Sequence, residues 1–320
     1  MQGDTPPLVS IVVCTRNRGQ QLTGTLDSIR TMESALPWEA VIVDNASTDD
    51  TADVIHAAAQ KDGRIRYLRV DRIGLGAGRD AAWRAARGAI ICFTDDDCYL
   101  KPDYVDKIAA AFAEFPEVGC IGGRILLHDP DDAPVTINES MEPISIPARR
   151  FVAAGVLHGA NLSFRRDALE ASGGFDPQLG AGTPFPAEDI DALAAVIWSG
   201  RPARYDPRPT VSHHHGRKAA DIPRLFIGYD AGRGAYWAKY ILRRDTRWIY
   251  ARQWWETNRS HKGKFVIRRV VNEMKSAYGY MRKQGRMDAV LLSFPFASAA
   301  LAYLFARENI RQWLRPRAGT

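Results

Sequence analysis

The chain has 320 residues, 46% of them hydrophobic and 25% charged, which is ordinary for a globular protein with one large domain or a domain and an extension. It contains no low-complexity segment and no internal repeat, and its four cysteines lack the spacing of a zinc site or a redox motif. We therefore expect reduced cysteines, as in a cytosolic protein. The N-terminus MQGDTPPLVSIVV lacks a basic start followed by a long apolar core, so we expect no signal peptide.

The net charge of +6 is distributed unevenly along the chain. Residues 1–216 contain 21 Lys and Arg against 30 Asp and Glu, a net charge of −9, whereas residues 217–320 contain 22 against 7, a net charge of +15. This asymmetry predicts two domains, an acidic body and a basic tail. Such a tail suits an anionic membrane surface or a nucleic acid, or it is a helical extension with an arginine-rich face in solvent.

Apolar runs alternate with segments of helical spacing in the first two-thirds of the chain. Strands are predicted at residues 8–14, 40–43, 65–70, 89–94, 119–127 and 156–164. Helices are predicted at residues 22–32, 51–60, 80–87, 102–115, 166–171 and 189–198, and again almost throughout the chain after residue 221. This order predicts an α/β protein with a mostly parallel sheet flanked by helices and a C-terminal helical extension. Ligands bind such sheets at the carboxyl ends of the strands.

Polar clusters follow the first, second and fourth predicted strands, in the segments CTRNR, VDNAS and TDDDC. All three fall at the same edge of the predicted sheet, so Asp44 and the group Asp95–Asp97 are expected to line one crevice. Asp44 is a candidate for hydrogen bonding to a nucleotide base. The alternative is a turn former or helix cap, which is common for an aspartate after a strand.

The segment TDDDC places three adjacent carboxylates after an apolar strand. Mg²⁺ and Mn²⁺ prefer oxygen ligands, and Mg²⁺ is often held by one or two carboxylates together with substrate phosphates. Residues i and i+2 at a strand end can point the same way, so Asp95 and Asp97 could serve one metal–nucleotide complex. The alternative is a solvated acidic turn before the helix that Pro102 opens.

Other segments carry less specific signals. The glycines of GLGAGRDAAWRAARG, from Gly74 to Gly88, do not form the dinucleotide-binding pattern G-x-G-x-x-G, and the segment follows the third strand. Arg79 within it either meets a diphosphate or is a surface arginine. Glu188 and Asp189 stand at a predicted helix start, where a carboxylate either acts as a general base on a hydroxyl or only complements the helix dipole.

The run His213–His215 could supply an imidazole to the metal, or it belongs to the surface or to local packing.

Taken in this order, the clusters resemble the family 2 glycosyltransferases of the GT-A fold. The resemblance covers about two-thirds of the chain, in the segments VSIVVCTRNR, AVIVDNASTDDT, GLGAGRDAAWRAARGAIICFTDDDC, GANLSFRRDALEASGGFDPQLGAGTPFPAEDIDALAAVIWSG and TVSHHHGRK. It implies a GT-A-like, Rossmann-like sheet and a D-x-D motif that holds Mn²⁺ or Mg²⁺. It also implies inverting transfer of a single sugar from a nucleotide-diphosphate sugar, with UDP expected, to the hydroxyl of a glycan or lipid-linked glycan in cell-surface polysaccharide synthesis.

The resemblance assigns roles to individual residues. The nucleotide-sugar contacts would be Thr15, Arg16, Asp44, Arg79, Asp95 and Asp96. Asp97 would be the direct metal ligand, and His213, or else His215, would contact the metal or the diphosphate. Asp189 would be the base, with Glu188 on the acceptor side. The metal would neutralise the charge of the leaving diphosphate while Asp189 takes the proton of the attacking hydroxyl, a single displacement that inverts the anomeric carbon.

Two positions depart from family patterns. The family usually has Arg-Asn where this chain has Arg79-Asp80. The segment Arg244–Trp248 fits the R-x-x-R-W pattern of processive synthases, but the chain lacks their multiple membrane spans, and we interpret this match as chance.

The tail contains a second apolar signal. The segment AVLLSFPFASAALAYLFA, residues 289–306, has no charge over 18 residues and reaches the lower length limit of a membrane-spanning helix. Pro295 and two serines weaken a spanning interpretation, so a helix in the membrane interface or one packed on the body stays possible. Upstream tryptophans and tyrosines alternate with arginines, which suits a lipid headgroup region or an aromatic core. We expect peripheral attachment to the inner face of the cytoplasmic membrane.

Two other functions use the same features. A metal-dependent phosphohydrolase or nucleotidyltransferase would use the acidic cluster, but no isolated nucleophilic aspartate motif follows the first strand. A nucleic-acid-binding protein would use the basic tail, with steeply salt-dependent binding, and would leave TDDDC and AEDID unexplained. We therefore expect no nucleic acid among the partners.

Overall fold

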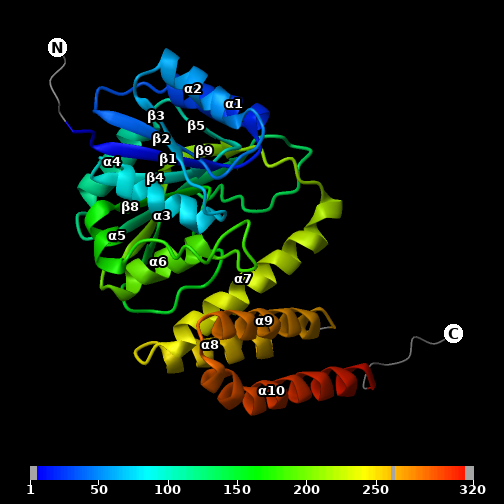
Figure 1. Ribbon diagram of the computed structural model, residues 1–320. Helices are drawn as coiled ribbons and strands as arrows, with labels where there is room; N and C mark the ends of the chain where they lie inside the picture. The colour runs from blue at the N-terminus through cyan, green and yellow to red at the C-terminus, as the bar shows by residue number, and fades with distance from the viewer. Residues whose placement is uncertain (1–5, 261–263, 314–320) are drawn as a thin grey trace. The chain divides into compact units, whose positions relative to one another are not determined.

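The computed structural model describes residues 6–260 and 264–313 and contains two compact units (Figure 1). Unit 1 comprises Met1–Thr183 and Glu188–Ile222, and unit 2 comprises Pro184–Ala187 and Pro223–Thr320. The change from acidic to basic composition lies close to this division. All four cysteines are free, as expected for reduced thiols.

Unit 1 is built on a mixed sheet, in which the described residues form nine strands. The strand order is β3-β2-β1-β4-β8-β6-β9-β5, and β7 pairs with β9 outside this path. The strands are β1 (Val9–Thr15), β2 (Trp38–Asp44), β3 (Ile65–Arg69), β4 (Ile90–Asp95), β5 (Cys98–Leu100), β6 (Cys120–Leu127), β7 (Ile144–Ile146), β8 (Asn161–Arg165) and β9 (Ala203–His213).

Strands β1, β2, β3 and β4 form the parallel half of the sheet. β1, β2 and β4 are nearly continuous runs of apolar residues because both faces of the sheet are covered. The carboxyl ends coincide: Thr15 lies beside Asp44, and Cys14 beside Asp95. The structure thus confirms that the three polar clusters meet at one edge of the sheet.

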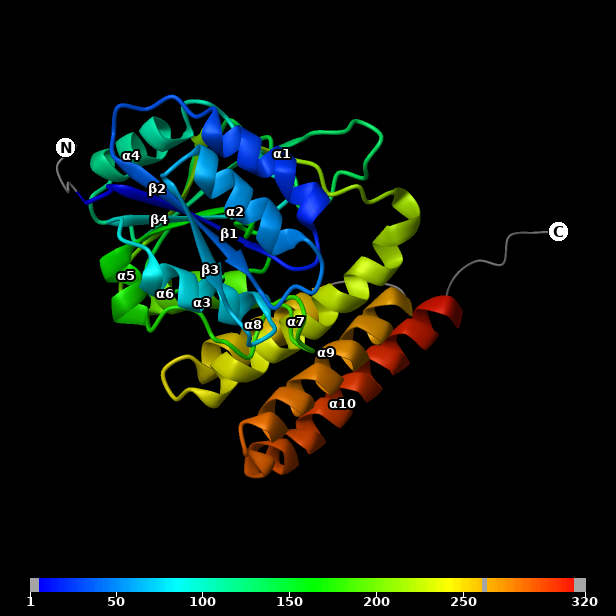
Figure 2. The ribbon, with the colours of Figure 1, turned by 45° about the horizontal axis from the view of Figure 1, so that its top comes forward.

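Helices cover both faces of this half (Figures 1 and 2). The helices are α1 (Gly19–Arg30), α2 (Thr51–Lys61), α3 (Leu75–Ala85), α4 (Tyr104–Glu114), α5 (Arg166–Ser172) and α6 (Glu188–Trp198). Side chains of α1, α2 and α4 join the larger hydrophobic core with alternate residues of β1, namely Val9, Ile11 and Val13. Helices α3, α5 and α6 lie on the opposite face.

Helix α3 begins earlier than the predicted start at residue 80. Its first turn contains Gly76 and Gly78, which propensity disfavours in a helix. Both are close-packing positions: a Cβ on Gly76 would lie 2.4 Å from the carbonyl oxygen of Leu179, and one on Gly78 would lie 3.3 Å from Cys14 Sγ. The missing side chains let the start of α3 lie against a loop and against β1.

In the second half of the sheet, strands β6 and β8 were predicted, but β5, β7, β9 and the antiparallel pairing were not. β8 runs antiparallel to both β4 and β6, and β9 runs parallel to β6 but antiparallel to β5. β9 escapes sequence analysis because it contains Pro207 and Pro209, which are unusual within a strand. The β6–β9 register shifts between Gly122 and Arg124, and this irregularity accommodates the prolines.

Unit 2 is helical after the short 3-10 helix η1 (Ala219–Asp221) of unit 1. Its helices are α7 (Ile222–Leu242), α8 (Arg247–Ser260), α9 (Lys264–Lys283) and α10 (Met287–Trp313). Three buried rings, Tyr236, Tyr240 and Tyr250, pack together between α7 and α8. Trp237 is also buried, whereas Trp248 is 79% exposed, so the tail tryptophans are not all of one kind.

The R-x-x-R-W segment has a structural explanation in this fold. Arg247 donates hydrogen bonds to the carbonyl oxygens of Ile241 and Leu242, which end helix α7. Thr246 donates to the carbonyl oxygen of Tyr240 at 2.5 Å. These contacts cap the carboxyl end of a helix, as cationic side chains commonly do.

Candidate active site

Asp95 ends β4, and Asp96 and Asp97 form the turn to β5. Asp95 accepts a hydrogen bond from Arg79 Nη2 at 2.9 Å. Asp96 has Oδ2 2.6 Å from Thr15 Oγ1 and Oδ1 2.6 Å from Arg18 Nη1. Ligand atoms of Asp95 and Asp97 lie within 4.8 Å of each other, so these two carboxylates converge as expected. The turn is therefore not a solvated acidic loop, because Asp96 and Asp97 are both buried.

Strand pairing brings a histidine to Asp97. In the β5–β9 ladder His213 lies opposite Cys98, and the backbone N–H of His214 donates to the Asp97 carbonyl oxygen at 2.8 Å. His213 Nε2 lies 3.2 Å from Asp97 Oδ1. Burial alone would raise the pKa of Asp97, but His213 and Arg18 outweigh burial and lower this pKa to about 2. The Asp97 carboxyl group is therefore ionised at neutral pH.

The same residues fit a divalent cation. One ligand atom from each of Asp95, Asp97, Cys98 and His213 lies within 4.8 Å of the others. Asp97 Oδ1 is buried and has no hydrogen-bond partner among the described residues, and His213 Nε2 lies 3.2 Å from it as an ion-pair neighbour. A buried carboxylate oxygen without a donor is costly unless a ligand completes it. Mn²⁺ and Mg²⁺ prefer oxygen ligands, and Mn²⁺ also accepts imidazole.

Cys98 is an unsuitable ligand for these hard cations. Full burial and the charges of Asp95 and Asp97 raise the pKa of its thiol well above the ordinary value. The thiol therefore stays protonated, whereas metal ligation requires the thiolate. Asp95, Asp97 and His213 remain as the three residues that fit.

His215 occupies a different position from His213. Its Nδ1 accepts a hydrogen bond from the Arg217 backbone at 3.0 Å and lies 3.7 Å from Asp132 Oδ2. Burial, with His213 and Arg217 nearby, lowers the pKa of His215, so its ring stays neutral. Of the two histidines, the geometry favours His213 as the partner of Asp97.

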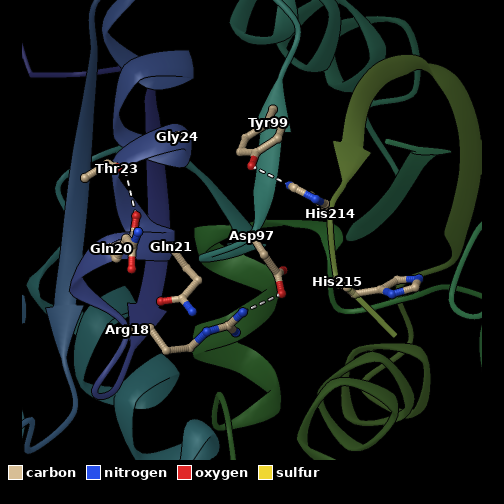
Figure 3. A pocket seen from close by; sticks show the side chains of 10 residues that line it. Arg18, Gln20, Gln21, Thr23, Gly24, Asp97, Tyr99, His214 and His215 are labelled. Atoms are coloured by element: carbon tan, nitrogen blue, oxygen red, sulfur yellow. Dashed lines mark hydrogen bonds and ion pairs between the residues drawn. The ribbon is translucent and has the colours of Figure 1, made fainter. Parts of the chain in front are cut away.

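Arg18 is a site residue that sequence analysis passed over. Its guanidinium bridges two carboxylates, at 2.6 Å from Asp96 and 3.0 Å from Asp97. Figure 3 shows the contact with Asp97. It lines a cavity of about 520 Å³ beside Asp97. The cavity is lined by Arg18, Gln20, Gln21, Thr23, Gly24, Asp97, Tyr99, His214, His215 and Gly216. The basic residues of CTRNR were the available signal, but only the fold reveals that the second of them faces the aspartates, whereas Arg16 is exposed.

Asp44 is surrounded by protein donors at the end of β2. Its Oδ1 accepts from the Ser47 N–H at 2.8 Å, and its Oδ2 accepts from Arg69 Nη1 at 2.6 Å and from Tyr67 Oη at 3.1 Å. Burial raises the pKa of Asp44, but the Ser47, Arg69 and Tyr67 contacts outweigh it and lower the pKa. Arg69 and Tyr67, which the sequence did not single out, thus belong to the same corner of the sheet edge as Asp44.

Arg79 is buried, so the surface-arginine alternative is wrong. It connects the aspartate turn to helix α6: Nη2 contacts Asp95, and Nη1 lies 3.4 Å from Glu188 Oε1. Burial and the neighbouring Asp189 raise the pKa of Glu188 to about 7, despite Arg79. Glu188 points inward, which favours a positioning role over direct contact with an acceptor. Asp80 receives hydrogen bonds from Trp83 and Arg84 within α3.

Asp189 is half-buried at the start of α6, and its carboxylate is held by two backbone amides. Oδ2 accepts from the Gly159 N–H at 3.1 Å, and Oδ1 accepts from the Ile190 N–H at 2.7 Å. The Gly159 carbonyl oxygen also accepts from Arg79 Nη2 at 3.1 Å. Gly159, in the segment GAN before β8, therefore touches both Arg79 and Asp189, and a Cβ at this position would require one of these side chains to move.

A comparison with protein families identifies the group to which the chain belongs. Residues 10–173, just over half of the chain, match the family model described as glycosyl transferase family 2. The chain belongs to glycosyl transferase family 2. This assignment removes the support for the phosphohydrolase, nucleotidyltransferase and nucleic-acid-binding alternatives.

Curated relatives match the first part of the chain. A putative glycosyltransferase, EpsH, from Bacillus subtilis (strain 168) is 34% identical over 104 residues, which are 32% of this chain and 29% of EpsH. The putative teichuronic acid biosynthesis glycosyltransferase TuaG from the same strain is 31% identical over 103 residues, which are 32% of this chain and 40% of TuaG. The chain thus matches well under two-thirds of the length of these relatives.

The fold extends the likeness to nearly the whole chain. A solved structure of the mannosyltransferase PcManGT from Pyrobaculum calidifontis, in complex with GDP-Man and Mn²⁺, superposes with a TM-score of 0.57 at 20% identity. The superposition covers 98% of this chain and 89% of that one. At this identity the likeness concerns the fold, and it confirms a GT-A architecture with a mixed central sheet and a helical C-terminal region.

Proposed function

We propose that the protein is an inverting, metal-dependent glycosyltransferase that moves a single sugar from a nucleotide-diphosphate sugar to a hydroxyl acceptor. The observation that carries the proposal is the convergence of ligand atoms from Asp95, Asp97 and His213. One of the carboxylate oxygens there, Oδ1 of Asp97, is buried and has no hydrogen-bond partner among the described residues. Asp189 belongs to the same edge of the sheet, linked to Asp95 through Arg79. Membership of the glycosyl transferase family supports the reaction class.

The donor is proposed to lie along the carboxyl ends of β1, β2 and β4. Thr15, Arg16 and Asp44 are the proposed contacts of the base, with Arg69 and Tyr67 held beside Asp44. We expect uracil as this base. Asp95 and Asp96 would flank the ribose and the diphosphate, and Arg79 and Arg18 would add positive charge nearby.

The proposed cation ligands are Asp97 and His213, with Asp95 beside them. When bound there, Mn²⁺ or Mg²⁺ would neutralise the negative charge that develops on the leaving diphosphate. Asp97 is suited to this task because its pKa is low, so the carboxylate needs no deprotonation before it binds a cation.

Asp189 is the proposed general base. Its two backbone donors fix the carboxylate without neutralising it, so it can accept the proton of an attacking hydroxyl. The ion pair between Arg79 and Glu188, the first residue of α6, holds the start of this helix in place. No second carboxylate is needed as a nucleophile in this scheme, and one displacement at the anomeric carbon inverts its configuration.

The acceptor class rests on the relatives and on charge. TuaG is named for teichuronic acid biosynthesis, a cell-surface polysaccharide, and we propose a glycan or lipid-linked glycan acceptor for this chain as well. The excess of basic residues after residue 217 complements an anionic lipid surface, so we place the enzyme as a peripheral protein on the inner face of the cytoplasmic membrane.

The test is calorimetry with UDP, GDP, CMP and dTDP, with and without Mn²⁺, on the wild type and on Asp97→Ala. We expect one nucleoside diphosphate to bind with metal present and the variant to lose this metal dependence. Asp103→Ala, which removes an exposed carboxylate near the start of α4, is the matched control and should bind like the wild type. Absence of binding by all four nucleotides in the presence of Mn²⁺ would contradict the donor-site assignment.

A further inference from the structure

Helix α10 exposes an unusual amount of apolar surface. Among the described residues, thirteen large hydrophobic side chains are exposed, and six of these lie on α10. They are Met287, Leu291, Leu292, Phe296, Tyr303 and Phe305, with exposed fractions from 49% to 80%. A soluble protein rarely leaves such side chains contiguous and uncovered unless a partner covers them.

The opposite face of α10 is already occupied within unit 2. Leu301 and Leu304 pack with Val266 and Val270 of α9, and Trp254 of α8 joins this small core. Figures 1 and 2 both show α9 and α10 side by side along their lengths. Helix α10 is thus apolar on both faces. In the described part of the chain one face packs on α9, and on the exposed face Tyr303 contacts the ring of Trp255 of α8, with 5.3 Å between ring centroids.

The neighbouring helix carries a row of positive charge. Arg268, Lys275 and Arg282 are exposed on α9 and follow one another at intervals of seven residues. Seven residues are close to two helical turns, so the three side chains lie along one face of α9. Residues 217–320 as a whole carry a net charge of +15.

We propose that α10 inserts its exposed apolar face into the surface of an anionic lipid bilayer, with the basic row of α9 contacting the headgroups. A second copy of this chain is disfavoured as the occupant, because two surfaces of the same strong positive charge repel each other. An anionic membrane offers both the apolar interior and the negative charge that this pair of helices complements.

The insertion is interfacial and does not span the bilayer. By length and composition alone, Met287–Arg307 is apolar enough to cross a membrane. If α10 spanned the membrane, the face that packs on α9 would also enter the lipid. Helix α10 would then have to separate from α9, or the basic row of α9 would have to enter the hydrocarbon with it. Charged side chains at that depth are costly, whereas interfacial insertion keeps the α9–α10 core and the charges in place.

The first experiment is flotation of the full-length protein with vesicles of phosphatidylcholine alone and of equal parts phosphatidylcholine and phosphatidylglycerol. We expect binding to the anionic vesicles that high salt reverses. The double variant Leu292→Glu with Phe296→Glu should bind about tenfold more weakly or worse, because it places charge on the inserting face. Met141→Glu, at a 62% exposed apolar side chain of unit 1, is the matched control and should bind like the wild type.

A second variant tests the electrostatic part. Arg268→Gln with Lys275→Gln and Arg282→Gln should lose about fivefold in affinity for each charge removed, and the preference for phosphatidylglycerol should weaken. These exposed residues lie outside the α9–α10 core, so thermal unfolding should stay at the wild-type temperature.

Specific outcomes would overturn the proposal. Unchanged vesicle binding by the Leu292→Glu, Phe296→Glu variant would do so, and binding that high salt does not release would indicate a spanning helix instead. A wild type that sediments as a dimer, becomes monomeric in this variant and ignores vesicles would assign the face to a second copy. The Asp97→Ala variant should bind vesicles normally, so failure of the membrane proposal and failure of the transferase proposal are separate results.

Discussion

Asp44 and Asp97 are buried aspartates at the same edge of one sheet, but their surroundings differ. Asp44 receives three hydrogen bonds from protein donors, including the guanidinium of Arg69. Asp97 receives one hydrogen bond from Arg18, and its other oxygen is buried with His213 Nε2 at 3.2 Å but with no hydrogen bond from the described residues. A carboxylate with all its donors supplied holds the fold together, whereas one left incomplete is ready for a ligand. The difference separates the structural end of the site from its chemical end.

The largest effect is expected at the chemical end, in Asp189→Asn. The amide cannot accept the proton of the attacking hydroxyl, so we expect the turnover number to fall by about 10²–10⁴-fold while the donor still binds. Steady-state kinetics together with calorimetry of the donor nucleotide measure both quantities. Asp167→Asn, an exposed carboxylate on α5, should leave both unchanged. Turnover within a few-fold of the wild type would remove Asp189 from the role of base.

Gly159→Ala tests whether the position of that carboxylate matters as well as its charge. An added Cβ would lie 2.8 Å from Arg79 Nη1 and 3.1 Å from Asp189 Oδ2, so one of these side chains must move. We expect turnover to fall by about tenfold to a hundredfold, the usual consequence of a misplaced catalytic group. Gly63→Ala has open space around its added Cβ and serves as the control. Equal turnover in the two variants would mean that Asp189 tolerates displacement.

At the end of β2, Asp44→Asn should cost stability, and it should also weaken donor binding, because Asp44 is a proposed contact of the base. The variant loses the ion pair with the half-exposed Arg69, and we expect urea unfolding to register a loss of about 1–3 kcal/mol. Asp71→Asn removes the other carboxylate that pairs with Arg69, one whose side chain is 86% exposed, and should cost less than about 0.5 kcal/mol. Equal losses in the two variants would break the distinction between the buried and the exposed partner.

An effect of similar size, which depends on pH, concerns Glu188, whose pKa is raised to about 7 by burial and by Asp189. The folded protein then holds this proton more tightly than the unfolded chain, so the contribution of Glu188 to stability falls as the pH rises from about 4.5 to about 7. Glu188→Gln should remove this fall, and urea unfolding at pH values on either side of that window should differ by about 1–3 kcal/mol less than in the wild type. Glu117→Gln, at an exposed glutamate, should keep the wild-type pH dependence. The same result for both variants would mean that Glu188 titrates normally.

The parallel half of the sheet was predictable because its signals are local. β1, β2 and β4 are apolar runs that end in polar clusters, and parallel strands bring such ends together whatever the rest of the fold does. The sequence also indicated that Asp95 and Asp97 converge, although the turn after β4, and not the period of a strand, brings them together.

What could not be predicted depends on partners distant in the sequence. The pairing of Arg18 with Asp96 and Asp97 joins residues almost eighty positions apart, and the burial of Arg79 depends on Gly159 and Glu188. β9 was missed because its prolines hide the strand pattern. Without this strand, the sequence could not show that pairing with β5 brings His213, rather than His215, to Asp97. The exposure of one face of α10 is likewise a tertiary property, since its composition suits a core helix equally well.

The pairing of β9 with β5 determines when the site can form during synthesis of the chain. The carboxylates of the aspartate turn leave the ribosome more than a hundred residues before His213, which reaches them only through the β5–β9 ladder. A nascent chain in which β9 has not yet been made therefore contains the aspartates of the proposed cation site but not its histidine. Because domains tend to fold as units during synthesis, the active site is completed with the last strand of the sheet and not before.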